Sequence, residues 1–157
     1  MSASHHTVRR FGAAWVGLCA ALALHVTDEA LTGFLDVYNP AVHAIRQRLP
    51  FLPLPTFEFR AWLAGLIAAV LLLSTLSVFA FRGARWMRWL ALPVGVLMLV
   101  NGLGHLAGSI YFRRVMPGAY SAPLLIAASI YLLVAARRLG ATSPHHAQAA
   151  STPMDRR

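Results

Sequence analysis

The chain has 157 residues, enough for about one domain. Hydrophobic residues make up 58% of it and charged residues only 12%, whereas a soluble domain carries roughly 25% charged residues. Four long apolar stretches contain no Asp, Glu, Lys or Arg: residues 11–27, 61–81, 89–112 and 115–136. Since a helix needs about 20 apolar residues to cross a bilayer, the composition excludes a soluble domain and predicts an integral membrane protein.

The formal charge of +9 does not indicate a nucleic-acid-binding protein. Every basic residue is an arginine, and most lie at the ends of the apolar stretches, where they meet lipid headgroups. A nucleic-acid-binding protein instead needs its basic residues on one soluble face. We therefore expect the lipid bilayer, and no nucleic acid, as a partner.

The predicted fold is all-α, an integral membrane bundle of four transmembrane helices. The helices are expected at residues 11–35, 60–81, 89–112 and 118–137. Together they form one transmembrane domain over residues 11–137. It lies between an N-terminal tail, residues 1–10, and a C-terminal tail, residues 138–157. Disorder is expected for residues 1–8 and 140–157.

The arginines predict the orientation. The N-terminus, the 82–88 loop and the C-terminal tail hold nine of them, and the opposite side holds five. By the positive-inside rule, both termini are cytoplasmic and the connector 36–59 lies outside. In this connector, Asn39-Pro40 predicts a helix start, and the apolar pattern that follows is typical of a short interfacial helix. The connector is either a plain surface segment or a lid.

The first helix carries ionisable residues that could take part in catalysis or ligand binding. Asp28 and Glu29 follow His25 by three and four positions, so all three side chains share one helix face. Thr32 and Asp36 continue this face, and Thr32 is a candidate supporting residue. An ionisable residue in the bilayer is costly and must face a protein interior or water. This face is therefore the predicted functional site.

The third helix supplies a matching group. Asn101 and His105 are four residues apart and share a face. His25 lies 15 residues beyond Arg10, and His105 lies 17 residues beyond Arg88. At 1.5 Å per residue, both histidines lie about 22–26 Å from the cytoplasmic arginines. We therefore expect them to meet at one level, with Asn101 as a supporting residue.

These residues carry a resemblance to a known family. His25-Val26-Thr27-Asp28-Glu29, a second histidine in a later helix (His105), and Met116-Pro117-Gly118 after it resemble the uncharacterised bacterial membrane family named for its HxxEE motif. The resemblance covers roughly residues 11–136. It implies a multi-pass protein of the bacterial inner membrane and marks Pro117 and Gly118 as a second motif.

Two positions depart from the family pattern. Asp28 stands where the family has its first glutamate, and it shortens the reach of the carboxylate by one methylene. Val115 stands where the family has a tyrosine in a Y-x-P-G element. The family brings no established reaction.

The first functional hypothesis is a metal site. His25, Glu29 and His105 offer two imidazoles and a carboxylate, a set that suits catalytic zinc or non-haem iron with an open position. Asp28 and Glu29 are the candidate catalytic carboxylates. Asp28 is then a fourth ligand, a hydrogen-bond partner of a ligand, or the general base for a metal-bound water. The expected substrate is small and hydrophobic or lipid-like.

Three alternatives remain open. The same residues suit metal-free acid–base catalysis in an isomerase of a lipid or sterol-like substrate. They also suit a proton or cation relay in a small transporter. In the third alternative they have no catalytic or transport role and form a polar cluster that holds the first and third helices together.

A bundle of four short helices is thin and compatible with a homodimer, although no face is specified.

Overall fold

The computed structural model describes residues 2–141, with side chains from residue 5 onward. Within this range the chain forms six helices and no strand. The helices are α1 (Ser2–Leu31), α2 (Phe34–Arg48), α3 (Phe59–Thr75), α4 (Ser77–Phe81), α5 (Arg85–Tyr111) and α6 (Ala122–Ala141). The prediction of an all-helical fold is confirmed.

Four segments are long and apolar enough to cross a membrane, as predicted. They are His5–Leu31, Phe59–Phe81, Arg85–Tyr111 and Ala122–Ala141. The second span consists of α3 and α4, which are separated only at Leu76. The first span is the most buried of the four and the second is the least buried. α1 is therefore the central helix of the bundle.

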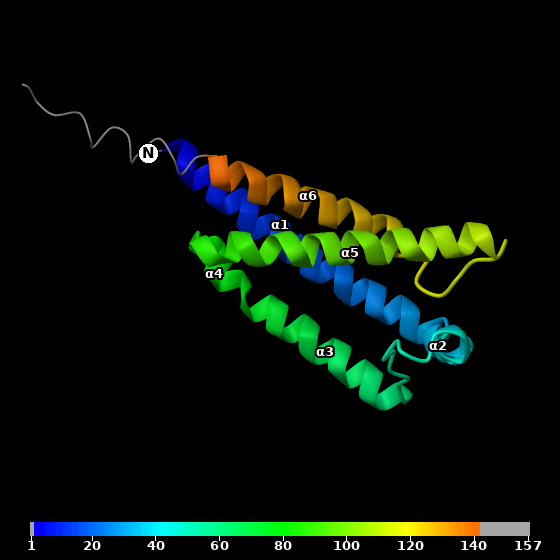
Figure 1. The fold of residues 1–157 in the computed structure, drawn as a ribbon. Coiled ribbons are helices and arrows are strands. Elements are labelled where there is room, and N and C mark those ends of the chain that lie inside the picture. The colour runs from blue at the N-terminus through cyan, green and yellow to red at the C-terminus, as the bar shows by residue number, and fades with distance from the viewer. Residues whose placement is uncertain (1, 142–157) are drawn as a thin grey trace, which may run out of the picture.

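Helices α3, α4 and α6 pack around α1 (Figure 1). α1 contacts α6, α3 and α4, and α5 packs along α6. Large apolar side chains fill the interior, among them Trp15, Leu18 and Leu132. Gly102 allows α5 and α6 to approach closely, because a Cβ there would lie 2.8 Å from Ile126. In a bilayer, such close packing rather than exclusion of water holds helices together.

The first helix differs from the prediction at both ends. α1 starts at Ser2, so it includes most of the segment expected to be an N-terminal tail, and it ends at Leu31 rather than at residue 35. Gly33 has a φ of 75°, a left-handed conformation that favours glycine and stops the helix. The expected continuous face from His25 to Asp36 is therefore wrong, because Asp36 belongs to α2.

α2 is a helix within the connector, where a short helix was expected, but it starts earlier. Pro40 lies inside α2 rather than at its first position, so the predicted Asn39-Pro40 helix start is wrong. The Asn39 side chain instead holds the connector, by donating to the carbonyl of Phe57 and accepting from its N–H. In Figure 1 α2 is seen nearly end-on while α1 and α5 run across the view, so α2 lies across the end of the bundle.

The last helix begins at Ala122 rather than at residue 118. The segment between α5 and α6 folds back against the bundle (Figure 1), with Gly118 in a left-handed conformation at a φ of 81°. This turn places Pro117 and Gly118 beside the C-terminal parts of α1 and α5. α6 also ends at Ala141 rather than at residue 137, so the disorder predicted for residues 140 and 141 is wrong. The rest of the predicted C-terminal disorder, residues 142–157, lies outside the described residues.

Candidate functional site

Three side chains from α1 and α5 meet near the end of the bundle that α2 crosses. Oε1 of Glu29 lies 3.0 Å from Nε2 of His105 and 3.6 Å from Nε2 of His25. His25 is fully buried and Glu29 is 5% exposed. One ligand atom from each residue lies within 4.8 Å of the other two. The structure thus brings together the three residues predicted as metal ligands.

The tautomer of His105 follows from its hydrogen bond to Pro117. Nδ1 of His105 is bonded to the backbone carbonyl oxygen of Pro117. A carbonyl oxygen only accepts, so Nδ1 carries the proton. In a neutral imidazole the lone pair is then on Nε2, the atom that faces Glu29. A carbonyl behind a histidine commonly orients a metal ligand in this way.

Ser121 fixes the tautomer of His25. Its Oγ lies 2.7 Å from Oδ2 of Asp28 and 2.8 Å from Nδ1 of His25. The hydroxyl has one proton, and the carboxylate is the strongest acceptor beside it. Ser121 therefore donates to Asp28 and accepts the Nδ1 proton of His25. The lone pair of His25 is consequently also on Nε2.

Nε2 of His25 is buried and has no hydrogen-bond partner among the residues that the structure describes. Its 3.6 Å separation from Oε1 of Glu29 is too long for a hydrogen bond. The Asn101 amide is close enough to interact with the imidazole, but its geometry with Nε2 does not meet that of a hydrogen bond. An unpaired buried nitrogen lowers the stability of the fold by about 1–3 kcal/mol. A ligand bound to this atom would remove that penalty.

The three groups fit a metal ion. Two imidazole lone pairs and a carboxylate converge, and a cation among them satisfies all three. Ligand atoms at about 2.0–2.2 Å in tetrahedral geometry lie about 3.3–3.6 Å apart, close to the separations from Glu29. A proton shared by His105 and Glu29 satisfies these two residues but leaves Nε2 of His25 unpaired. The donor set therefore favours a metal ion over a metal-free ion pair.

Asp28 lies behind His25 rather than within the cluster. Its Oδ2 accepts hydrogen bonds from both the hydroxyl and the backbone N–H of Ser121. Of the three roles predicted for Asp28, this position matches the partner of a ligand. Ser121 is a site residue that the sequence reasoning missed. The two residues are 93 positions apart, and a serine near a helix start carries no signal of such a contact.

The Pro117-Gly118 motif belongs to the site. Pro117 supplies the carbonyl that holds His105. A Cβ at Gly118 would lie 2.8 Å from Cε1 of His105 and 3.1 Å from Cγ of Glu29. Only a glycine lets the turn pack this closely against the two side chains, and the φ of 81° also favours glycine.

The two predicted supporting residues differ in position. Asn101 lies beside His25, as expected. Thr32 is exposed, and its hydroxyl donates to the backbone carbonyl of Asp28 one turn earlier. The structure therefore places Asn101 at the cluster and Thr32 outside it, because α1 ends at Leu31.

A groove of about 380 Å³ leads to the cluster from between α2 and α5. Its walls are mostly apolar, and Asn101 and His105 belong to the lining. Phe34 from α2 packs beside His105, with 5.8 Å between the ring centroids. His105 is thus accessible from the groove, whereas His25 is enclosed behind it.

Comparison with protein families gives one result. The profile of a family described as a protein of unknown function with HXXEE motif matches residues 16–132. No curated protein and no solved structure matches the chain. The matched range contains all three members of the cluster, together with Asp28, Pro117, Gly118 and Ser121. The chain therefore belongs to the HXXEE family, and its motif residues His25 and Glu29 form the buried cluster with His105.

Proposed function

We propose that the protein is an integral membrane enzyme that uses a divalent metal, zinc or iron, held by His25, Glu29 and His105. The observation that best supports this proposal is the buried, unpaired Nε2 of His25 at the meeting point of the three residues. Two histidines and one carboxylate form the ligand set of catalytic zinc and of non-haem iron sites with an open position.

When bound, such a metal supplies Lewis acidity toward a substrate oxygen or a water molecule. The protein residues orient the ligands and balance the charge. Glu29 contributes negative charge, and Pro117 holds the His105 ring by its Nδ1 proton. Asp28 acts on His25 through Ser121, which makes the imidazole a stronger ligand. Asp28 and Glu29 remain the candidate proton carriers.

The groove indicates the class of substrate. Its apolar walls and its opening between α2 and α5 suit a small hydrophobic or lipid-like molecule that enters from the bilayer. Gly104 and Gly108 add no side chain to the α5 wall, which leaves room beside His105. In this proposal α2 covers the substrate. The connector then acts as a lid, one of the two roles considered for it.

The cellular placement follows the arginine distribution. Nine arginines near the termini against five on the other side favour cytoplasmic termini. The protein then lies in the bacterial inner membrane with the cluster in the outer half of the bilayer.

The alternatives have less support. Metal-free acid–base catalysis has the 3.0 Å contact between His105 and Glu29 in its favour, but it leaves Nε2 of His25 unpaired. A proton relay needs a polar path across the membrane. The buried side chains of α1 between the cluster and the N-terminal end of the helix are instead apolar, including Trp15, Leu18 and Leu22. A purely structural cluster has no need of a buried carboxylate, which is costly in a membrane.

Metal analysis of the purified protein tests the proposal. We expect about one zinc or iron per wild-type chain, from the three-ligand set, and loss of that metal in His25→Ala and His105→Ala. His43→Ala is the matched control, because His43 is an exposed histidine of α2 outside the cluster. Equal metal content in all four proteins, or none in the wild type after supplementation with zinc and iron, contradicts the proposal.

A further inference from the structure

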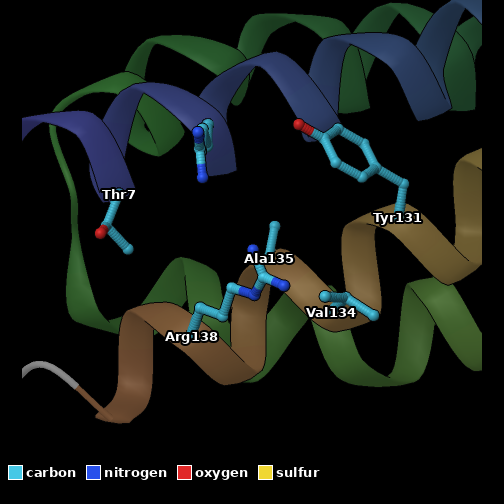
Figure 2. A pocket seen from close by; sticks show the side chains of 6 residues that line it. Thr7, Tyr131, Val134, Ala135 and Arg138 are labelled. Atoms are coloured by element: carbon cyan, nitrogen blue, oxygen red, sulfur yellow. The ribbon is translucent and has the colours of Figure 1, made fainter.

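A second pocket lies at the opposite end of the bundle, between the beginning of α1 and the end of α6. Its volume is about 250 Å³, and it is lined by Thr7, Arg10, Tyr131, Val134, Ala135 and Arg138. Figure 2 shows the Arg138 side chain extending along α6 past Ala135, and the Tyr131 hydroxyl pointing toward α1. Two arginines from different helices therefore share one small pocket.

The charges around this pocket are one-sided. Within residues 2–141, seven arginines lie at this end of the bundle: Arg9, Arg10, Arg82, Arg85, Arg88, Arg137 and Arg138. The acidic residues of the same range, Asp28, Glu29, Asp36 and Glu58, all lie at the other end. The ion pairs in the described part of the chain involve histidine rather than arginine. Two like charges in one pocket repel, so an anion between them is stabilising.

We propose that Arg10 and Arg138 bind the phosphate group of an anionic phospholipid. Guanidinium groups match phosphate oxygens with two parallel hydrogen bonds. Basic pockets between membrane helices commonly hold lipid headgroups. This site is separate from the His25 cluster and does not depend on the function proposed for it.

The surroundings favour a lipid over a free phosphate ion. The pocket lies where the span His5–Leu31 begins and the span Ala122–Ala141 ends. The ends of a transmembrane span are expected at the level of the lipid headgroups. Val134 and Ala135 add an apolar wall against which the start of an acyl chain can pack. Tyr131 is half-exposed, with its ring on the deeper side of the pocket, as is usual for tyrosine at a membrane interface.

Lipid titration of the detergent-purified protein tests this site. The probes are phosphatidylglycerol, phosphatidylcholine and inorganic phosphate, with binding followed by native mass spectrometry and by the melting temperature. We expect phosphatidylglycerol to bind in preference to phosphatidylcholine. Arg10→Gln and Arg138→Gln should each weaken its binding about fivefold. Arg9→Gln and Arg137→Gln are the matched controls, since they remove the same charge next to the pocket without lining it, and we expect little change.

The outcomes separate three explanations. Equal wild-type affinity for phosphatidylglycerol and phosphatidylcholine overturns the proposal without recourse to any variant. Equal weakening in all four variants overturns it in favour of a diffuse basic surface. Stabilisation by inorganic phosphate as strong as that by phosphatidylglycerol overturns the lipid as the source of the phosphate. The melting temperature of each variant without lipid identifies any variant that fails to fold.

Discussion

Oε1 of Glu29 and Nε2 of His105 lie 3.0 Å apart, in a contact that joins α1 to α5. Nδ1 of His105 donates its proton to the carbonyl of Pro117. In a neutral His105, Nε2 therefore has only a lone pair to offer to the carboxylate. Two acceptors at this distance repel each other unless a cation or a second proton lies with them. The contact is therefore sensitive to the presence of a metal ion.

We expect Glu29→Gln to remove the metal and to leave the metal-free fold nearly intact. A neutral amide oxygen is a poorer ligand than a carboxylate, so bound metal should fall more than about tenfold. The amide still hydrogen-bonds, and such bonds in membranes average about 0.6 kcal/mol. Elemental analysis and the melting temperature after chelation measure the two effects.

Glu58→Gln is the control for this variant, because Glu58 caps α3 by accepting from the N–H of Ala61, away from the cluster. It should retain the metal. A large loss of stability in Glu29→Gln with no metal in the wild type would point to a structural ion pair instead.

Ser121→Ala is expected to weaken metal binding without touching a ligand. The change removes the hydroxyl that links Asp28 to His25, and the imidazole can then adopt the other tautomer. Losses of about 10–100-fold in metal affinity are typical for such partners, and the lost hydrogen bonds destabilise the fold by about 1–3 kcal/mol. Competition with a chelator measures the affinity.

Ser129→Ala is the matched control for Ser121→Ala. Ser129 is, like Ser121, a buried serine, but it lies within α6 and its hydroxyl donates to the carbonyl of Leu125 in that helix. We expect unchanged metal affinity for this variant. The same affinity in both variants would exclude a role for Ser121 in holding His25.

The orientation can be tested with tags. A reporter fused to either terminus should lie in the cytoplasm, and a reporter inserted within residues 50–56 should lie outside. The physical reason is the excess of arginine near the termini, nine against five. If both termini report outside, the bundle is inverted and the cluster moves to the inner leaflet.

The sequence predicted the fold and the centre of the site for identifiable reasons. A continuous apolar stretch of about 20 residues matches the length of a membrane-spanning helix and is too long for a barrel strand. The spacing of His25 and Glu29 puts them on one face, and similar distances from the flanking arginines, 15 and 17 residues, placed His105 at a similar depth. These are short-range or one-dimensional quantities, so the sequence contains them directly.

The surroundings of the site could not be predicted because they depend on turns and on tertiary contacts. The left-handed turn at Gly33 moved Asp36 out of α1 and put Thr32 outside the site. Ser121 reaches Asp28 only because the segment before α6 folds back onto α1. Neither feature leaves a periodic pattern in the sequence.

Gly118→Ala should disrupt the site through the backbone. Gly118 has a φ of 81°, and a residue with a Cβ in the left-handed region costs about 1–2 kcal/mol. The new methyl group would also lie 2.8 Å from Cε1 of His105 and 3.1 Å from Cγ of Glu29. The turn must then move away, which withdraws the Pro117 carbonyl from Nδ1 of His105.

We therefore expect Gly118→Ala to lower both the melting temperature and the metal content. Gly104→Ala is its control, since Gly104 lies within α5 and a Cβ there meets no atom within 4 Å. Alanine is the better helix former by about 1 kcal/mol, so Gly104→Ala should be as stable as the wild type or more stable, and should keep its metal. The two proteins are compared in one detergent by thermal melting and elemental analysis. A Gly118→Ala protein that melts and binds metal like Gly104→Ala would show that the close packing of Gly118 against His105 and Glu29 is not needed for the site.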